Sequence, residues 1–244
     1  MFAKFLKKIY NIFARESEGI NMNLKPISSQ ISVFLSDGVM NPSRLTDEIQ
    51  KTFDGVFNKE DYTLNLEEAP NDMPLVRYRS DDGKYVYDFA KKRINFYLNF
   101  NENDNMNLFE NYKLKVQTVV NEVLLKYSNI SRVGLAINYY IDKRDDKYLF
   151  WVNKYKFPFF ESNSTSEISY TINNNFIYKG LKFNKILILT SGKITNTKNV
   201  PIVSIDINNL STSKISDDTI KYIFEEINFY KKEILEEVLK NGQQ

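Results

Sequence analysis

Hydrophobic and polar residues alternate along the segment 75–100, and strict alternation is typical of β-strands that have one buried face. Two turns interrupt it, Ser80–Gly83 and Ala90–Arg93. The first contains Asp82-Gly83, a pair that favours a tight hairpin because glycine tolerates positive φ. The pattern therefore predicts a three-stranded antiparallel meander with one covered face. The residues expected on that face in the second and third strands are Tyr85, Tyr87, Phe89, Ile94, Phe96, Leu98 and Phe100.

Similar runs predict more strands on both sides of this meander. Gly134 lies inside one of them, which indicates a close backbone approach or a bulge at that position. The stretch 58–73 is acidic and irregular, and no element is expected there. The further predicted strands are 31–35, 131–141, 166–175, 182–190 and 201–207.

Apolar residues at helical spacing predict helices at about 41–53, 108–127 and 216–240. The last two are long and have wide apolar stripes, so we expect them to cover the sheet. The predicted fold class is α+β: a largely antiparallel sheet covered by two long amphipathic helices, in a single domain over residues 22–244. A coarse repetition of elements in the two halves leaves open an arrangement of two similar subdomains.

Residues 1–21 are expected to form a basic amphipathic helix or an extension ahead of the domain. Its apolar positions include Phe2, Phe5 and Phe13, and Lys7 and Lys8 lie between them. Such a helix suits a partner or a membrane surface, with residues 1–15 making the contact. The alternative is that it docks on its own domain. No stretch reaches the roughly 18 apolar residues that a transmembrane segment needs, and none is expected.

The 244 residues include no histidine and no cysteine, which narrows the chemistry. Relays built on histidine or a thiol, zinc sites with those ligands and disulfides are excluded. We expect no catalytic residue, no metal and no cofactor. A magnesium-dependent nuclease is the enzymatic alternative, and its candidate carboxylates are Asp37, Asp81, Asp82, Asp142 and Asp206. The position of Asp81 and Asp82 in a turn already accounts for that pair.

The net charge of only +2 excludes a basic field over the whole chain, but local basic clusters remain. Basic residues interleaved with aromatic ones suit contact with phosphates and stacking on bases, so RNA or DNA binding through 143–156 is one alternative. The absence of cysteine agrees with a reducing cytoplasm. The candidate nucleic-acid-binding residues are Arg77, Arg79, Lys91, Lys92, Arg93, Lys143, Arg144, Lys147, Trp151, Lys154 and Lys156.

Another protein is the partner that the sequence favours. The chain contains 18 Phe and 16 Tyr, which supply rigid contact surface. Phe159 and Phe160 end a dense apolar run, 157–160, beside a polar loop. If exposed, this run would form a patch that needs a partner. The alternative is that it is a segment of the core. We therefore expect a non-enzymatic, macromolecule-binding protein that recognises another protein.

Three motifs carry a family resemblance: Arg79-Ser80-Asp81-Asp82-Gly83 with Ile94-Asn95 after it, a long helix, and Arg132-Val133-Gly134-Leu135. With these motifs the chain resembles a sporadically distributed, functionally uncharacterised bacterial family of about 250 residues. The resemblance covers about 25–240 and implies a shared fold and a bacterial or phage context. The resemblance implies no biochemical activity for this chain. A role in phage–host conflict is the expectation that follows from this context.

Overall fold

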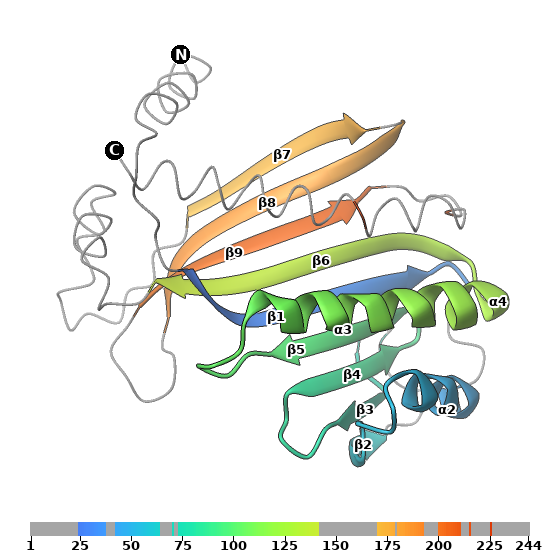
Figure 1. The fold of residues 1–244 in the computed structure, drawn as a ribbon. Helices are drawn as coiled ribbons and strands as arrows, with labels where there is room; N and C mark the ends of the chain where they lie inside the picture. The colour runs from blue at the N-terminus through green and yellow to red at the C-terminus, as the bar shows by residue number, and fades with distance from the viewer. Residues whose placement is uncertain are drawn as a thin grey trace.

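An antiparallel β-sheet dominates the computed structural model, which describes residues 24–37, 42–63, 70, 73–141, 170–178, 180–192, 200–210, 215 and 225. Nine strands form one sheet in the order β2-β3-β4-β5-β1-β6-β9-β8-β7 (Figure 1). The strands are β1 (Leu24–Leu35), β2 (Lys59–Thr63), β3 (Val76–Arg79), β4 (Tyr85–Ala90), β5 (Arg93–Asn99), β6 (Ile130–Ile141), β7 (Tyr170–Tyr178), β8 (Leu181–Gly192) and β9 (Val200–Asn209).

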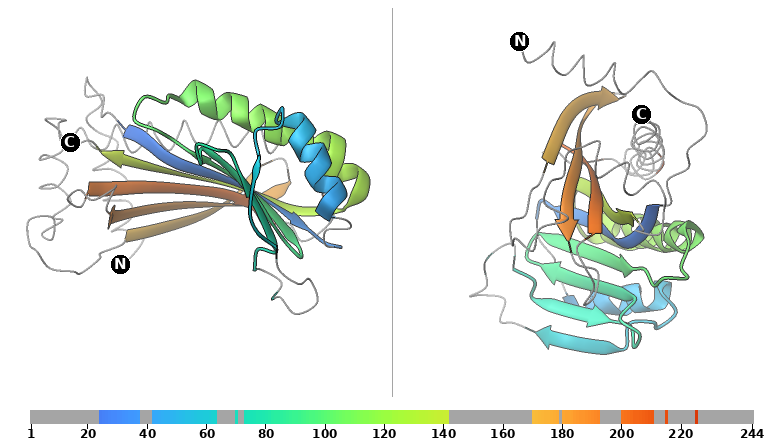
Figure 2. Two further views of the ribbon diagram at one scale, coloured as in Figure 1. Left: turned by 90° about the horizontal axis from the view of Figure 1, so that it is seen from below. Right: turned by 90° about the vertical axis from the view of Figure 1, so that its left-hand side faces the viewer.

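The described helices lie on one side of this sheet, as the left view of Figure 2 shows. They are α2 (Pro42–Thr52) and a continuous helical segment made of α3 (Met106–Thr118), the π-helical stretch η1 (Val119–Leu124) and α4 (Leu125–Tyr127). Asn105 is the N-cap of α3, because its side chain accepts a hydrogen bond from the backbone N–H of Asn107. No helix in the described part of the chain is both long enough and apolar enough to cross a membrane.

The expected sheet covered by two long helices is wrong. In the described ranges the sheet is the main structure, and only the 11-residue α2 and the continuous helical segment 106–127 lie on it. The strand expected at 31–35 was also too short, because β1 begins at Leu24 and not at Ile31. Residues 24–30 are mostly polar, yet their backbone pairs with β6, and from Ser28 on also with β5. The predicted helices 1–21 and 216–240 lie outside the described residues, apart from Glu225.

Strand β2 occupies a stretch where no element was expected. Its residues Lys59, Glu60 and Asp61 are charged and exposed, so no hydrophobic alternation marks it. It pairs only with β3 among the described strands and so forms one edge of the sheet. Charged side chains on an edge strand oppose the addition of a further strand. Because β2 has charged residues in place of alternating apolar ones, its sequence resembles that of a loop.

Gly134 in β6 confirms the expected close approach. Its Cα partner in β9 is Asn208, and a Cβ atom added at Gly134 would lie 3.2 Å from the Cβ of Asn208. The neighbouring strand therefore leaves little room for a larger residue. No register shift occurs at Gly134, so the alternative of a bulge there is excluded.

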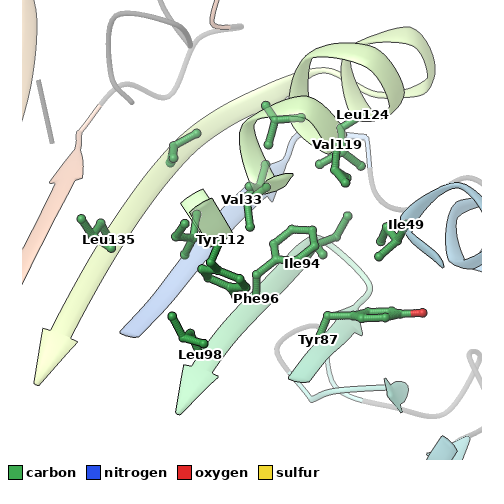
Figure 3. Packing of buried hydrophobic residues seen from close by; sticks show 14 of the residues in the cluster. Val33, Ile49, Tyr87, Ile94, Phe96, Leu98, Tyr112, Val119, Leu124 and Leu135 are labelled. Carbon is green, nitrogen blue, oxygen red and sulfur yellow. The ribbon is translucent and has the colours of Figure 1, made fainter. Parts of the chain in front are cut away.

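The hydrophobic core lies between the sheet and these helices (Figure 3). Phe96 is fully buried, and its ring stacks on Phe53 with the centroids 6.3 Å apart. Phe53 also meets the edge of Tyr112 from α3 at 6.0 Å. These contacts join the turn that directly follows α2 to α3 and β5, because Phe53 contacts a ring from each of those two elements.

Replacing Phe96 with alanine tests this packing. We expect the free energy of unfolding to fall by about 3–5 kcal/mol, because the change leaves a cavity beneath both helices. Urea unfolding followed by circular dichroism measures the loss. Leu114→Ala is the control, since that side chain on α3 is 56% exposed and its loss is expected within about 0.5 kcal/mol. A loss below about 1 kcal/mol for Phe96→Ala would contradict the packing.

Candidate functional site

The sheet face opposite α2 and α3 is polar. Successive side chains of a strand point to opposite faces, and directly paired residues share a face. In β1, Ile31 and Val33 belong to the core, so Gln30, Ser32 and Phe34 lie on the other side. We call this side of the strands β3, β4, β5, β1 and β6 the polar face. The described helices leave it uncovered in Figure 2.

Hydrogen bonds join a row of paired residues across four strands of the polar face. The Arg77 guanidinium donates to Asp88 at 2.8 Å, and the Asn95 amide donates to the other carboxylate oxygen at 2.7 Å. The hydroxyl of Ser32 and the amide of Gln30 in turn donate to the Asn95 carbonyl, at 2.8 and 3.2 Å. The row therefore fixes side chains from β3, β4, β5 and β1 relative to one another.

Asp88 is the centre of this network, because its side chain is fully buried and accepts hydrogen bonds from Arg77 and Asn95. A buried carboxylate is tolerated when a cation and hydrogen-bond donors surround it. Tyr97 lies beside it on β5. Burial, together with the charge of Asp88 and a hydrogen bond to it, raises the pKa of Tyr97 to about 12. The Tyr97 hydroxyl therefore stays protonated at neutral pH.

Four of the chain's seven arginines gather on the polar face: Arg77, Arg79, Arg93 and Arg132. Arg79 pairs with Asp61 of β2 at 2.6 Å. Arg93 and Arg132 both pair with Phe34 of the strand between them, and their guanidinium carbons lie 5.9 and 4.9 Å from its ring centroid. An aromatic ring between two guanidinium groups is stabilised by cation–π attraction.

The structure brings together five of the residues that the sequence proposed for nucleic-acid binding. Arg77, Arg79 and Arg93 lie on the polar face, and Lys91 and Lys92 form the β4–β5 turn beside it. The other candidates lie outside the described residues: Lys143, Arg144, Lys147, Trp151, Lys154, Lys156, and the partner or membrane residues Phe2, Phe5, Lys7, Lys8, Phe13, Phe159 and Phe160.

Sequence reasoning missed the members of this face that depend on pairing between distant strands. Asn95 and Tyr97 could have been found, because they alternate with Ile94, Phe96 and Leu98 in β5. Phe34 and Arg132 also alternate with core residues of their own strands, but alternation does not show which residues of other strands they meet. Their position beside Arg93 depends on the register of β1 with its two neighbours, which the local sequence does not encode.

The candidate magnesium ligands that lie in the described residues do not come together. Asp82 accepts from the Ser80 hydroxyl and the Lys84 backbone N–H, and these hydrogen bonds lower the pKa of its carboxyl group. Gly83 has the positive φ of 67° that this turn requires. Asp206 accepts a hydrogen bond from Asn208, and Asp142 lies outside the described residues. Within the described ranges no three acidic side chains are grouped as a metal ion would need.

Comparisons with known proteins add little to this picture. No family model matches the chain, and no curated protein matches it. Among solved structures, the rolling circle replication initiator protein from Geobacillus stearothermophilus is 12% identical, with 84% of this chain and 80% of that chain covered at a TM-score of 0.35. The Methanococcus jannaschii TBP is 9% identical, with 88% and 97% covered at a TM-score of 0.26. Likenesses this weak carry no functional argument.

The raised pKa of Tyr97 predicts a specific loss of stability in alkali. The fold favours the protonated phenol, so its contribution is complete below the unfolded-state pKa of about 10 and is lost as pH rises towards 12. We expect the urea midpoint of Tyr97→Phe to fall less steeply above pH 10 than that of the unmodified chain, because phenylalanine has no proton to lose. Parallel curves for the two proteins would contradict the environment described for Tyr97.

Proposed function

We propose that the protein binds single-stranded nucleic acid across the polar face of its sheet. The observation that supports this most directly is the gathering of Arg77, Arg79, Arg93 and Arg132 on one face, where the last two lie over the ring of Phe34. This face differs from the sequence-derived candidate at 143–156, which lies outside the described residues.

The arginines supply the phosphate contacts. A guanidinium is planar, carries five N–H donors and binds phosphate oxygens in a bidentate manner. Asp88 and Asp61 hold Arg77 and Arg79 through one carboxylate each, which orients the two guanidinium groups. Lys91 and Lys92 at the adjoining turn extend the positive charge beyond the strands. The phosphate backbone of a nucleic acid that crosses the polar face would meet positively charged side chains on strands from β3 to β6.

The aromatic residues of the polar face supply surfaces on which bases can stack. Phe34 and Tyr97 are only half-buried, and bases stack on aromatic rings and on guanidinium planes. Arg93 and Arg132 already lie over the Phe34 ring, so the group offers stacking planes held in position before binding. Stacking of this kind requires unpaired bases, which is why we propose a single strand.

The polar face favours nucleic acid over the protein partner that the sequence favoured. The apolar run 157–160, on which that expectation rests, lies outside the described residues. Protein interfaces generally have an apolar centre, whereas the centre of this face is a hydrogen-bonded row of Arg77, Asp88, Asn95 and Ser32. Recognition of another protein, in phage–host conflict or elsewhere, stays a prediction.

Binding of a labelled single-stranded oligonucleotide, followed by fluorescence anisotropy at several salt concentrations, tests the proposal. We expect affinity to fall steeply with salt, because each phosphate contact releases counterions. In the double variant Arg93→Gln/Arg132→Gln, two contacts are lost. The slope of log K against log salt should then decrease in magnitude by about 1.4, that is about 0.7 for each contact.

Arg44→Gln is the matched control, because Arg44 is an exposed arginine on α2, on the helix side of the sheet. Its affinity and salt slope should equal those of the unmodified chain. Thermal unfolding of all three proteins checks that the substitutions leave the fold intact. An unchanged slope in the folded double variant, or no salt-sensitive binding at all, rejects the polar face as the binding site.

A further inference from the structure

The two edges of the sheet differ in a way that bears on assembly. The edge strand β2 has five residues, and three of them are charged. The edge strand β7 has nine residues, Tyr-Thr-Ile-Asn-Asn-Asn-Phe-Ile-Tyr, without a charge or a proline. Among the described strands β7 pairs only with β8 (Figure 1). Charge and proline are devices that block pairing at an edge, and β7 has neither.

The sequence of β7 is symmetric in residue type about its middle residue, Asn174. Moving outwards from Asn174, the residues on its two sides correspond in kind: an amide with an amide, an apolar residue with an apolar residue, and a tyrosine with a tyrosine at the ends. Only the third step differs in polarity. The successive pairs are Asn173 with Asn175, Ile172 with Phe176, Thr171 with Ile177, and Tyr170 with Tyr178.

We infer that β7 is a dimerisation edge, on which β7 of a second copy of this chain pairs antiparallel about a two-fold axis at Asn174. Every second residue of an edge strand directs its N–H and C=O away from the sheet, and an identical antiparallel strand satisfies both copies equally. The symmetric order places residues of the same kind opposite each other at every step except that of Thr171 with Ile177, and such cross-strand pairs stabilise sheets.

The exposed residues of β7 fit this assignment. Asn173, Asn174, Asn175 and Ile177 are exposed, and Ile177 is 68% exposed, the highest value among the exposed large hydrophobic side chains of the described residues. In the inferred register Ile177 of one copy lies opposite Thr171 of the other, so its methyl groups gain a β-branched neighbour. A two-fold axis perpendicular to the sheet also places both polar faces on the same side of the joined sheet.

Single-cysteine variants test the register directly, because the chain has no cysteine of its own. In Asn174→Cys the two thiols would face each other across the axis with Cα atoms about 5 Å apart, within the range of a disulfide. In Asn175→Cys the two Cα atoms would be roughly 8 Å apart, which is too far. We expect mild oxidation to cross-link Asn174→Cys at least tenfold faster than Asn175→Cys.

Asn121→Cys, exposed on η1, reports the rate of random collision. Cross-linking of Asn174→Cys at the rate of Asn121→Cys, or of Asn175→Cys at the rate of Asn174→Cys, overturns the inferred pairing.

Charged substitutions at Asn173 and Asn175 test the inferred dimer independently of cross-linking. Asn173 and Asn175 face each other across the axis, so Asn173→Lys/Asn175→Lys places like charges opposite at both positions, and Asn173→Lys/Asn175→Glu places opposite charges there. Sedimentation over a concentration series should give a dimer for the unmodified chain. The dissociation constant should rise roughly 3- to 30-fold in the first variant and should not rise in the second.

A folded chain that sediments as a monomer throughout overturns the inference, and so does an equal effect of the two charge variants. Both variants change exposed residues only, so circular dichroism should show an unaltered fold.

Discussion

The register of β1 determines both faces of this sheet. β1 lies between β5 and β6, and its alternation assigns Ile31, Val33 and Leu35 to the core and Gln30, Ser32 and Phe34 to the polar face. A slip of one residue would exchange the two sets, burying amides under the helices and exposing the aliphatic residues. The core therefore fixes the register, and the register in turn places Phe34 directly opposite Arg93 and Arg132.

The polar face has an organisation that solubility alone does not require. Its central carboxylate, Asp88, is fully buried, and such a group destabilises a fold unless its partners are in place. Arg77, Asn95 and Tyr97 provide those partners, each from a different position on the neighbouring strands. The hydrogen-bonded row holds Arg77 in position, Asp61 holds Arg79, and Arg93 and Arg132 lie against Phe34. Fixed guanidinium groups lose less conformational freedom when an anion binds.

The sequence could predict the local elements but not the way in which they are joined. Alternation located the meander and the later strands, because each has an apolar face of its own, as in Ile94, Phe96 and Leu98. It failed where pairing depends on the backbone, as in polar residues 24–30 and charged β2. It also favoured two long helices as the cover, whereas the described structure is mostly sheet. The absence of histidine and cysteine excluded relays and zinc sites built on those residues. The polar face could be recognised only from the register of the paired strands.

The same division between local and long-range information applies to function. Arg77, Arg79 and Arg93 could be proposed from sequence, since all three belong to the predicted three-stranded meander, as does the basic turn at Lys91. Arg132 comes from a strand about 40 residues away and reaches Phe34 only because β1 separates β5 from β6. A sheet with this strand order thus builds a cationic, aromatic surface from segments that are individually unremarkable. Because the face spans several strands, substitutions that shift β1 would separate Phe34 from Arg93 and Arg132 without changing any arginine.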